Sequence, residues 1–111
     1  MIDSESSPRI GQFVLITQGR ETGQYAIIIK ILDEKFVLIA DGDKRKFHTP
    51  KKKNIHHLEF LDCVSPEVQN SILETGRVTN GKLRYALTKF VNEQVTDLKK
   101  GEQVDGERRC N

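Results

Sequence analysis

The first sixty residues alternate between apolar segments and polar turns at the spacing of short β-strands. Apolar and β-branched residues are concentrated at 13–17, 25–32 and 36–40, and Gly-rich or acidic residues separate these segments. Residues 25–32 make the strongest predicted strand, and apolar side chains occupy both of its alternating faces. We therefore predict three strands here, the second of them apolar on both sides.

Two further strands are predicted beyond residue 40. A short polar strand is expected at 44–47, Pro50 then interrupts the hydrogen-bonded ladder, and a last strand is expected at 54–61. Five short strands without intervening helices favour a small antiparallel barrel over a parallel sheet. Closure into a barrel also removes the exposed edges that an isoleucine-rich strand would otherwise offer to other chains.

Glycine and aspartate mark the predicted turns. Asp41-Gly42 is a hairpin signal, because glycine adopts positive φ easily and aspartate hydrogen-bonds the local backbone. Gly19 and Gly23 bracket a turn with the sequence GRETG. The residues predicted to form structural turns are Gly11, Gly19, Gly23, Asp41 and Gly42.

After residue 64 the period changes to that of a helix. Ser65 is a helix N-cap followed by Pro66 at the first helical position, so a helix is predicted to run to about Thr75 and to end at Gly76. A second helix is predicted from about residue 80 to residue 94. Its apolar stripe consists of Leu83, Ala86, Leu87, Phe90 and Val91.

The predicted organisation is a mainly β domain with an α extension. Residues 1–9 have little to bury and are expected to form a disordered tail, whereas residues 10–62 form the five-stranded barrel. Residues 63–98 contain the two helices of the extension. Residues 99–111 are expected to form a second disordered tail.

Positive charge is concentrated in one part of the chain. The formal net charge is only +2, yet residues 44–58 carry six Lys or Arg, all three histidines and no Asp or Glu. A local cationic cluster on a small β-domain favours a polyanionic partner, and RNA is the first candidate. This segment is expected to form a fixed loop at one end of the barrel. There, lysines contact phosphates as point charges, and Arg45 binds a phosphate through two hydrogen bonds or stacks on a base.

Three short motifs follow one another in this half of the chain. They are G-R-x-x-G at 19–23, D-G-x-x-R-K at 41–46, and P-K-K-K-N with a following histidine at 50–57. With Gly11, the first of them resembles a KOW motif, which is a strand, a glycine-bearing loop and a second strand. The full order is similar to that of small bacterial KOW-domain RNA-binding proteins related to the KOW-containing large-subunit ribosomal proteins of archaea and eukaryotes.

The resemblance covers about residues 10–60 and implies an SH3-like barrel that binds RNA. The partner it implies is ribosomal RNA of the large subunit, in a ribosomal-protein-like factor of translation in the cytoplasm. Glu21 and Thr22 depart from the family pattern, which tends to carry Asp and a basic residue in this loop. The candidate RNA-binding residues are Arg20, Lys44, Arg45, Lys46, His48, Lys51, Lys52, Lys53, Asn54 and His57.

Few features of the sequence favour metal binding or catalysis over RNA binding. His56 and His57 are adjacent, so on a strand they would point to opposite faces rather than chelate one metal ion. Cys63 and Cys110 form no CxxC motif, and neither a Ser/His/Asp order nor a GK[ST] loop stands out. We therefore predict no metal site, no cofactor and no catalysis. No apolar segment approaches the ~18 residues of a membrane span. The acidic, Ser-rich N-terminus lacks a secretory signal.

Two alternatives stay open for the partner. The main alternative to RNA is a protein-interaction module, as in KOW barrels of the NusG type, with the apolar stripe of the second helix as the docking surface. We favour packing of this stripe on the barrel. Lys82 and Arg84 are then available to assist RNA binding, and Phe47 is the one aromatic residue inside the basic segment. A monomer is expected away from the ribosome.

Overall fold

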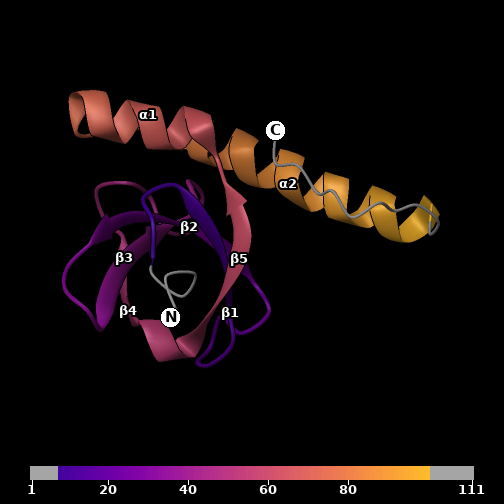
Figure 1. The fold of residues 1–111 in the computed structure, drawn as a ribbon, viewed down its shortest axis with the longest axis horizontal. Helices are drawn as coiled ribbons and strands as arrows, with labels where there is room; N and C mark the ends of the chain where they lie inside the picture. The colour runs from indigo at the N-terminus through magenta and orange to yellow at the C-terminus, as the bar shows by residue number, and fades with distance from the viewer. Residues whose placement is uncertain (1–7, 101–111) are drawn as a thin grey trace, which may run out of the picture.

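The computed structural model describes residues 8–100 (Figure 1). The predictions of disorder at 1–9 and 99–111 fall mainly on residues 1–7 and 101–111, which lie outside the described residues. Within the described range, the strands are β1 (Gln12–Ile16), β2 (Tyr25–Ile31), β3 (Phe36–Ala40), β4 (Lys51–Asn54) and β5 (Leu58–Val64). The helices are the single 3₁₀ turn η2 (Ile55–His57), α1 (Pro66–Thr75) and α2 (Asn80–Lys100).

The five strands form one antiparallel sheet in the order β4-β3-β2-β1-β5. Strand β1 pairs with both β2 and β5, so the last strand returns beside the first and the sheet curls into a barrel (Figure 1). The turn η2 connects the two edge strands, β4 and β5. The predicted fold class, a small five-stranded β-barrel followed by two helices, is confirmed.

Strand β2 is buried on both faces, as its sequence predicted. Ala26 and Ile28 belong to a cluster made entirely by the barrel, together with Val14, Ile16, Val37, Ile39 and Leu58. Ile27 and Ile29 belong to a second cluster that the helices complete. Its other buried members are Phe13, Ala40, Val68, Val78, Leu83, Ala86, Leu87 and Phe90. The helices therefore cover the part of the outer face around Phe13, Ile27, Ile29 and Ala40. The rings of Phe13 and Phe90 stack there with centroids 4.3 Å apart.

Helix α1 begins and ends as its sequence predicted. The Ser65 hydroxyl accepts a hydrogen bond from the Val68 N–H at 3.3 Å, Pro66 occupies the first turn, and Gly76 ends the helix with a φ of 84°. Helix α2 begins at Asn80 but continues past the predicted end at residue 94 to Lys100. Its apolar stripe packs on the sheet, which is the arrangement favoured from the sequence. In Figure 1, α2 extends beyond the barrel.

The prediction of a strand at 44–47 is wrong. These residues belong to a loop between β3 and β4, because local hydrogen bonds take the groups that a strand would need. The Asp41 carboxylate accepts the N–H groups of Asp43 and Arg45, and the Arg45 carbonyl accepts those of Asp41 and Gly42. The N–H of Phe47 donates to Asn80 Oδ1 of α2 at 2.7 Å. The fixed basic loop expected beyond Pro50 is also wrong, since Lys51–Asn54 is strand β4 itself.

Gly42 anchors the β3–β4 loop to the start of α2. Its φ is +82°, and a Cβ at this position would collide with the Asn80 carbonyl oxygen and lie 2.9 Å from the Leu83 Cβ. One guanidinium nitrogen of Arg84 also donates to the Gly42 carbonyl at 2.9 Å. The loop and the helix are therefore packed backbone against backbone at this point.

Replacing Gly42 by alanine should destabilise the fold more than the same change at Gly23. Gly23 has a similar φ of +92°, but no atom lies within 4 Å of the place that a Cβ would occupy. The change Gly23→Ala should therefore cost only the strain of a left-handed backbone, about 1–2 kcal/mol. Gly42→Ala adds a clash with α2, and we expect a total loss above about 2 kcal/mol. Urea unfolding of both variants measures the difference, and equal losses would contradict the packing described for Gly42.

Candidate nucleic-acid interface

The basic segment is divided among three structural elements. Lys44, Arg45, Lys46 and His48 lie in the β3–β4 loop. The three consecutive lysines form most of the edge strand β4. Asn54 ends β4 and caps η2, and His57 is the last residue of η2 before β5. A contiguous stretch of sequence therefore covers more than one surface of the barrel.

Strand geometry separates the three lysines of β4. Lys51 and Lys53 are opposite Ile39 and Val37, whose side chains lie in the barrel cluster, so these two lysines share the inner face of the sheet. Lys52 is opposite Leu38, which packs against the outer, helix-covered cluster. The Lys52 ammonium lies 4.5 Å from the centroid of the Phe36 ring. Lys51 and Lys53 are half-buried, and Lys52 is exposed.

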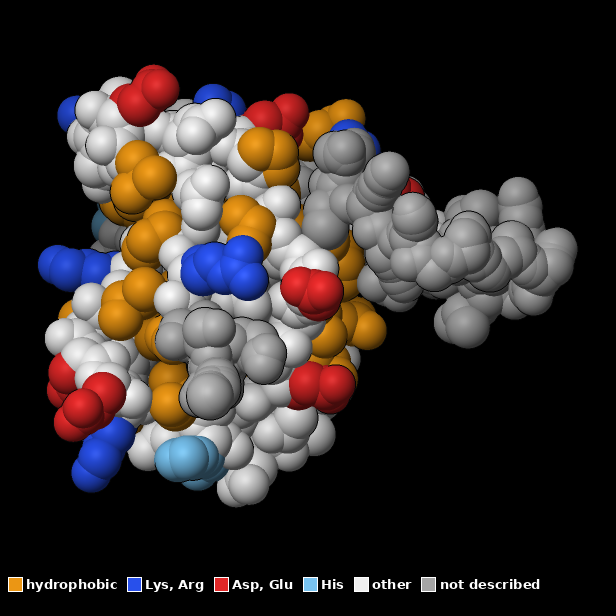
Figure 2. Space-filling view, in the orientation of Figure 1, with side chains coloured by type: hydrophobic (Ala, Val, Ile, Leu, Met, Phe, Trp, Pro, Cys, Tyr) orange, Lys and Arg blue, Asp and Glu red, His pale blue; other side chains and the backbone are white. Residues whose placement is uncertain are grey.

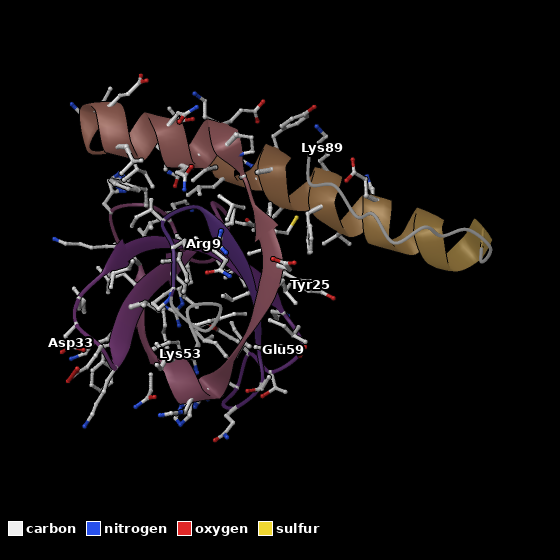
Figure 3. The ribbon with its side chains drawn as sticks, viewed as in Figure 1. Arg9, Tyr25, Asp33, Lys53, Glu59 and Lys89 are labelled. Atoms are coloured by element: carbon white, nitrogen blue, oxygen red, sulfur yellow. The ribbon has the colours of Figure 1, made fainter. Side chains whose placement is uncertain are left out.

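Lys53 connects β4 to the loop between β1 and β2. Its ammonium donates to the Gln18 carbonyl at 2.9 Å, and it lies 2.9 Å from the point where a Cβ on Gly19 would stand. Glycine at position 19 thus leaves room for this contact. The carbonyl carries no formal charge, so this contact is not an ion pair. Arg20, two residues after Gln18, is exposed. Figure 3 shows Lys53 at the lower end of the barrel, distant from Lys89 on α2.

Arg45 is the predicted site residue with an acidic partner. Its guanidinium donates to the Glu21 carboxylate at 3.1 Å, with the two side chains 36% and 25% exposed. Glu21 is one of the two positions at which the sequence departs from the KOW pattern. The Nε atom of Arg45 is buried without a hydrogen-bond partner among the described residues. Arg45 therefore holds the β1–β2 loop against the β3–β4 loop and has part of its charge compensated.

Several other predicted residues have local structural contacts. The Asn54 side chain accepts the His56 N–H at 2.8 Å and caps η2, while the His57 carbonyl accepts the Thr17 N–H at 2.9 Å. His48 is exposed in the loop, and Lys46 donates to the carbonyl of Asp43 at 3.1 Å. Within residues 8–93, no carboxylate forms an ion pair with Arg20, Lys44 or the lysines of β4.

Two residues that position the basic segment were missed from the sequence. The Asn80 side chain holds the Phe47 backbone, and the Gln18 carbonyl receives the Lys53 ammonium. The sequence placed Asn80 at the start of a helix, but it gave no sign that its side chain binds the backbone of Phe47, which lies far away in sequence. A backbone carbonyl such as that of Gln18 carries no sequence signal. Phe47 itself is half-buried against the outer cluster.

A groove of about 590 Å³ lies between the β1–β2 loop, the β3–β4 loop and α2. The residues that line it include Tyr25, Leu87, Asp41 and Asp43. The Asp41 carboxylate is engaged by two backbone N–H groups, so it shapes the turn. Among the described residues, no three His, Cys, Asp or Glu side chains are grouped as metal ligands.

Charged side chains of both signs occur together on the face shown in Figure 2. Lys and Arg side chains stand there as separate groups between acidic ones. Two basic side chains contact the β1–β2 loop: Lys53 reaches it from β4, and Arg45 reaches it from the β3–β4 loop. This end of the barrel is therefore the candidate polyanion interface.

No protein-family model matches the chain. The chain is 58% identical over 71 residues to "Putative ribosome-binding protein YbzG" of Bacillus subtilis (strain 168), a match that covers 64% of this chain and 96% of YbzG. It is 36% identical over 86 residues to the large ribosomal subunit protein eL14 of Staphylothermus marinus, covering 78% and 88% of the two chains. The match to eL14 of Aeropyrum pernix is 36% identical over 53 residues. It covers 48% of this chain and about half, 53%, of that protein.

Replacing Glu21 by glutamine should strengthen polyanion binding while changing stability little. The ion pair with Arg45 is partly exposed, so its loss should cost less than about 1 kcal/mol in urea unfolding. Removal of the carboxylate raises the local positive potential, and the affinity for an RNA hairpin should increase a few-fold in fluorescence anisotropy. Glu74→Gln on α1 removes the same charge from a distant exposed position. An equal increase in both variants would show that only net charge matters.

Proposed function

Since the chain belongs to the family that unites YbzG of Bacillus subtilis with the large ribosomal subunit protein eL14, we propose that it is a non-catalytic, ribosome-associated RNA-binding protein. The name of YbzG supports ribosome association, and eL14 supports the large subunit as the site of action. The direct ligand in this proposal is large-subunit ribosomal RNA. The protein acts in the cytoplasm, where ribosomes work, and is a monomer away from them.

The observation that carries the proposal is the lysine-rich edge strand β4 beside the exposed Arg20 loop. Three consecutive ammonium groups stand on a strand whose backbone is fixed by pairing with β3. None of them is paired with a described carboxylate, so their charges remain available to phosphates. A rigid strand presents these charges at lower entropic cost than a flexible tail.

Binding in this proposal is mainly electrostatic. Lysines contact phosphates as point charges, and Arg20 and Lys44 add further cations from the neighbouring loops. If about four to six phosphates are neutralised, a roughly fourfold rise in salt should weaken binding by about two orders of magnitude. His48, Asn54 and His57 are proposed as uncharged contacts to sugar or phosphate oxygens. Arg45 takes part if RNA displaces Glu21.

In this proposal the helices stabilise the sheet and do not bind RNA through their apolar stripe. The apolar stripe of α2 is buried on the sheet, so it is not offered to a protein partner in the described structure. This favours RNA over the protein-interaction alternative. Lys82 and Arg84 remain candidate auxiliary contacts at the start of α2. No described helix is both long enough and apolar enough to cross a membrane.

Reversing the three charges of β4 should abolish ribosome binding. The variant Lys51→Glu, Lys52→Glu and Lys53→Glu replaces attraction to phosphate by repulsion, and we expect loss of co-sedimentation with ribosomes through a sucrose cushion. A parallel variant with glutamine at all three positions keeps the side-chain stems, and far-ultraviolet circular dichroism checks that both fold. Unchanged co-sedimentation of the folded variants would refute the proposal. Ribonuclease treatment before a pull-down separates RNA-mediated from protein-mediated association.

A further inference from the structure

A second row of cations crosses the outer face of the sheet. Lys30 of β2 is opposite Leu38 of β3, and Leu38 is in turn opposite Lys52 of β4. Residues that are opposite each other in antiparallel strands point to the same face. Lys30 and Lys52 therefore stand on one face, separated by one strand, with backbones roughly 10 Å apart. Both side chains are exposed.

On the edge strand β4, Lys52 of this row and the inner pair lie on opposite faces. Lys51 and Lys53 point to the inner face, where Lys53 reaches the β1–β2 loop, and Lys52 points to the outer face beside Lys30. The residue between the outer cations, Leu38, is half-buried under the helix-covered cluster. Strand β4 is thus a thin cationic edge with charges on both sides.

The acidic groups near the outer row belong to the β2–β3 turn. Asp33 accepts the N–H groups of Lys35 and Phe36 at 2.8 and 2.9 Å, and these bonds, with a smaller contribution from Lys52, lower the pKa of its carboxyl group. No described carboxylate is within ion-pair distance of Lys30 or Lys52. The turn therefore reduces the potential at the tip of the hairpin but leaves both ammonium groups unpaired.

We infer that RNA is contacted on both faces of β4, with Lys30 and Lys52 forming a second phosphate-binding row. This inference deepens the proposed function and rests on it. The inner face lines the packed barrel, so Lys53 meets RNA beside the β1–β2 loop, where its ammonium lies, whereas Lys30 and Lys52 meet RNA on the outer face. The ligand is therefore a folded RNA that presents two backbone segments, one to each side of the edge strand. Recognition of this kind depends on RNA shape and phosphate position rather than on base identity.

Lysines on an edge strand have an ordinary structural explanation as well. Charged side chains on such strands prevent edge-to-edge pairing with other chains, and this role requires no ligand. It applies to β4 and also to Lys30, because the described pairing of β2 with β1 ends at Ile27 and the end of β2 that carries Lys30 pairs with β3 alone. Because edge protection requires no ligand, a contribution of Lys30 to RNA binding separates the two explanations.

The test compares two double variants in the full chain. Lys51→Gln with Lys53→Gln removes the inner charges, and Lys30→Gln with Lys52→Gln removes the outer ones. Affinity for an RNA hairpin is measured across a salt series by fluorescence anisotropy. Each lost phosphate contact should reduce the slope of log affinity against log salt by about 0.7–0.9, so each pair should reduce it by about 1.5. Affinity at low salt should fall on the order of tenfold for each pair.

A charge-matched control decides whether the effect is local. Arg9→Gln with Arg77→Gln removes two exposed positive charges outside the sheet's strands. It should leave the slope close to that of the unmodified protein. The midpoint of thermal unfolding is measured for every variant, because Lys52→Gln also removes the contact with Phe36.

Three outcomes are distinguishable. Equal slope reductions in the inner and outer variants support contact on both faces. A reduction in the inner variant alone overturns this inference but leaves the proposed function in place. If neither variant differs from the arginine control, RNA binding through β4 is itself wrong, and the inference fails with it.

Discussion

The structure depends on burying strand β2 on both of its faces. Ile28 is fully buried in the barrel, and Ile27 is fully buried under the helices. Removing such side chains from water contributes roughly 1.5–3 kcal/mol each, so neither face can be left uncovered without a large loss of stability. The helices are therefore part of the fold rather than an appendage. Their position in turn fixes the β3–β4 loop through Gly42 and Asn80.

Stability and the proposed function are provided by different interactions. Apolar burial and the strand ladder hold the barrel, whereas the cations of β4 stand at its edge, where they add little to stability. The contacts that brace the neighbouring loops, Arg45 with Glu21 and Lys53 with the Gln18 carbonyl, are few and partly exposed. Contacts of this kind are weak enough to be exchanged for a phosphate, since exposed ion pairs contribute about 1 kcal/mol or less.

The relatives and the geometry are consistent with each other. YbzG is matched over 96% of its length and eL14 of Staphylothermus marinus over 88%, so the comparison extends beyond the basic segment. A rigid strand with cations on alternating faces suits a folded polyanion of fixed shape. Most of the aromatic side chains pack in or against the core, as the stacked and buried rings of Phe13 and Phe90 do. In the proposed function, this leaves charge and shape as the main means of recognition.

The local pattern of apolar and polar residues was sufficient to predict much of the fold. The apolar periods predicted three strands, the two-sided burial of β2 and the stripe of α2, because hydrophobic periodicity is a property of the chain itself. The two ends of α1 could also be predicted from the sequence, because Ser65, Pro66 and Gly76 cap the helix through contacts within one or two helical turns. The concentration of positive charge in 44–58 and the likeness to KOW proteins were also present in the sequence.

The register of the basic segment was decided only by tertiary structure. A lysine run has no apolar period, so nothing in it shows which residues pair with β3 or which face each side chain takes. The loop at 44–47 formed because Asp41 and the distant Asn80 bind its backbone groups, and β4 was thereby moved to Lys51–Asn54. Pairing across strands also placed Lys30 beside Lys52. Such contacts join residues far apart in sequence, and their energies depend on the packed fold rather than on local composition.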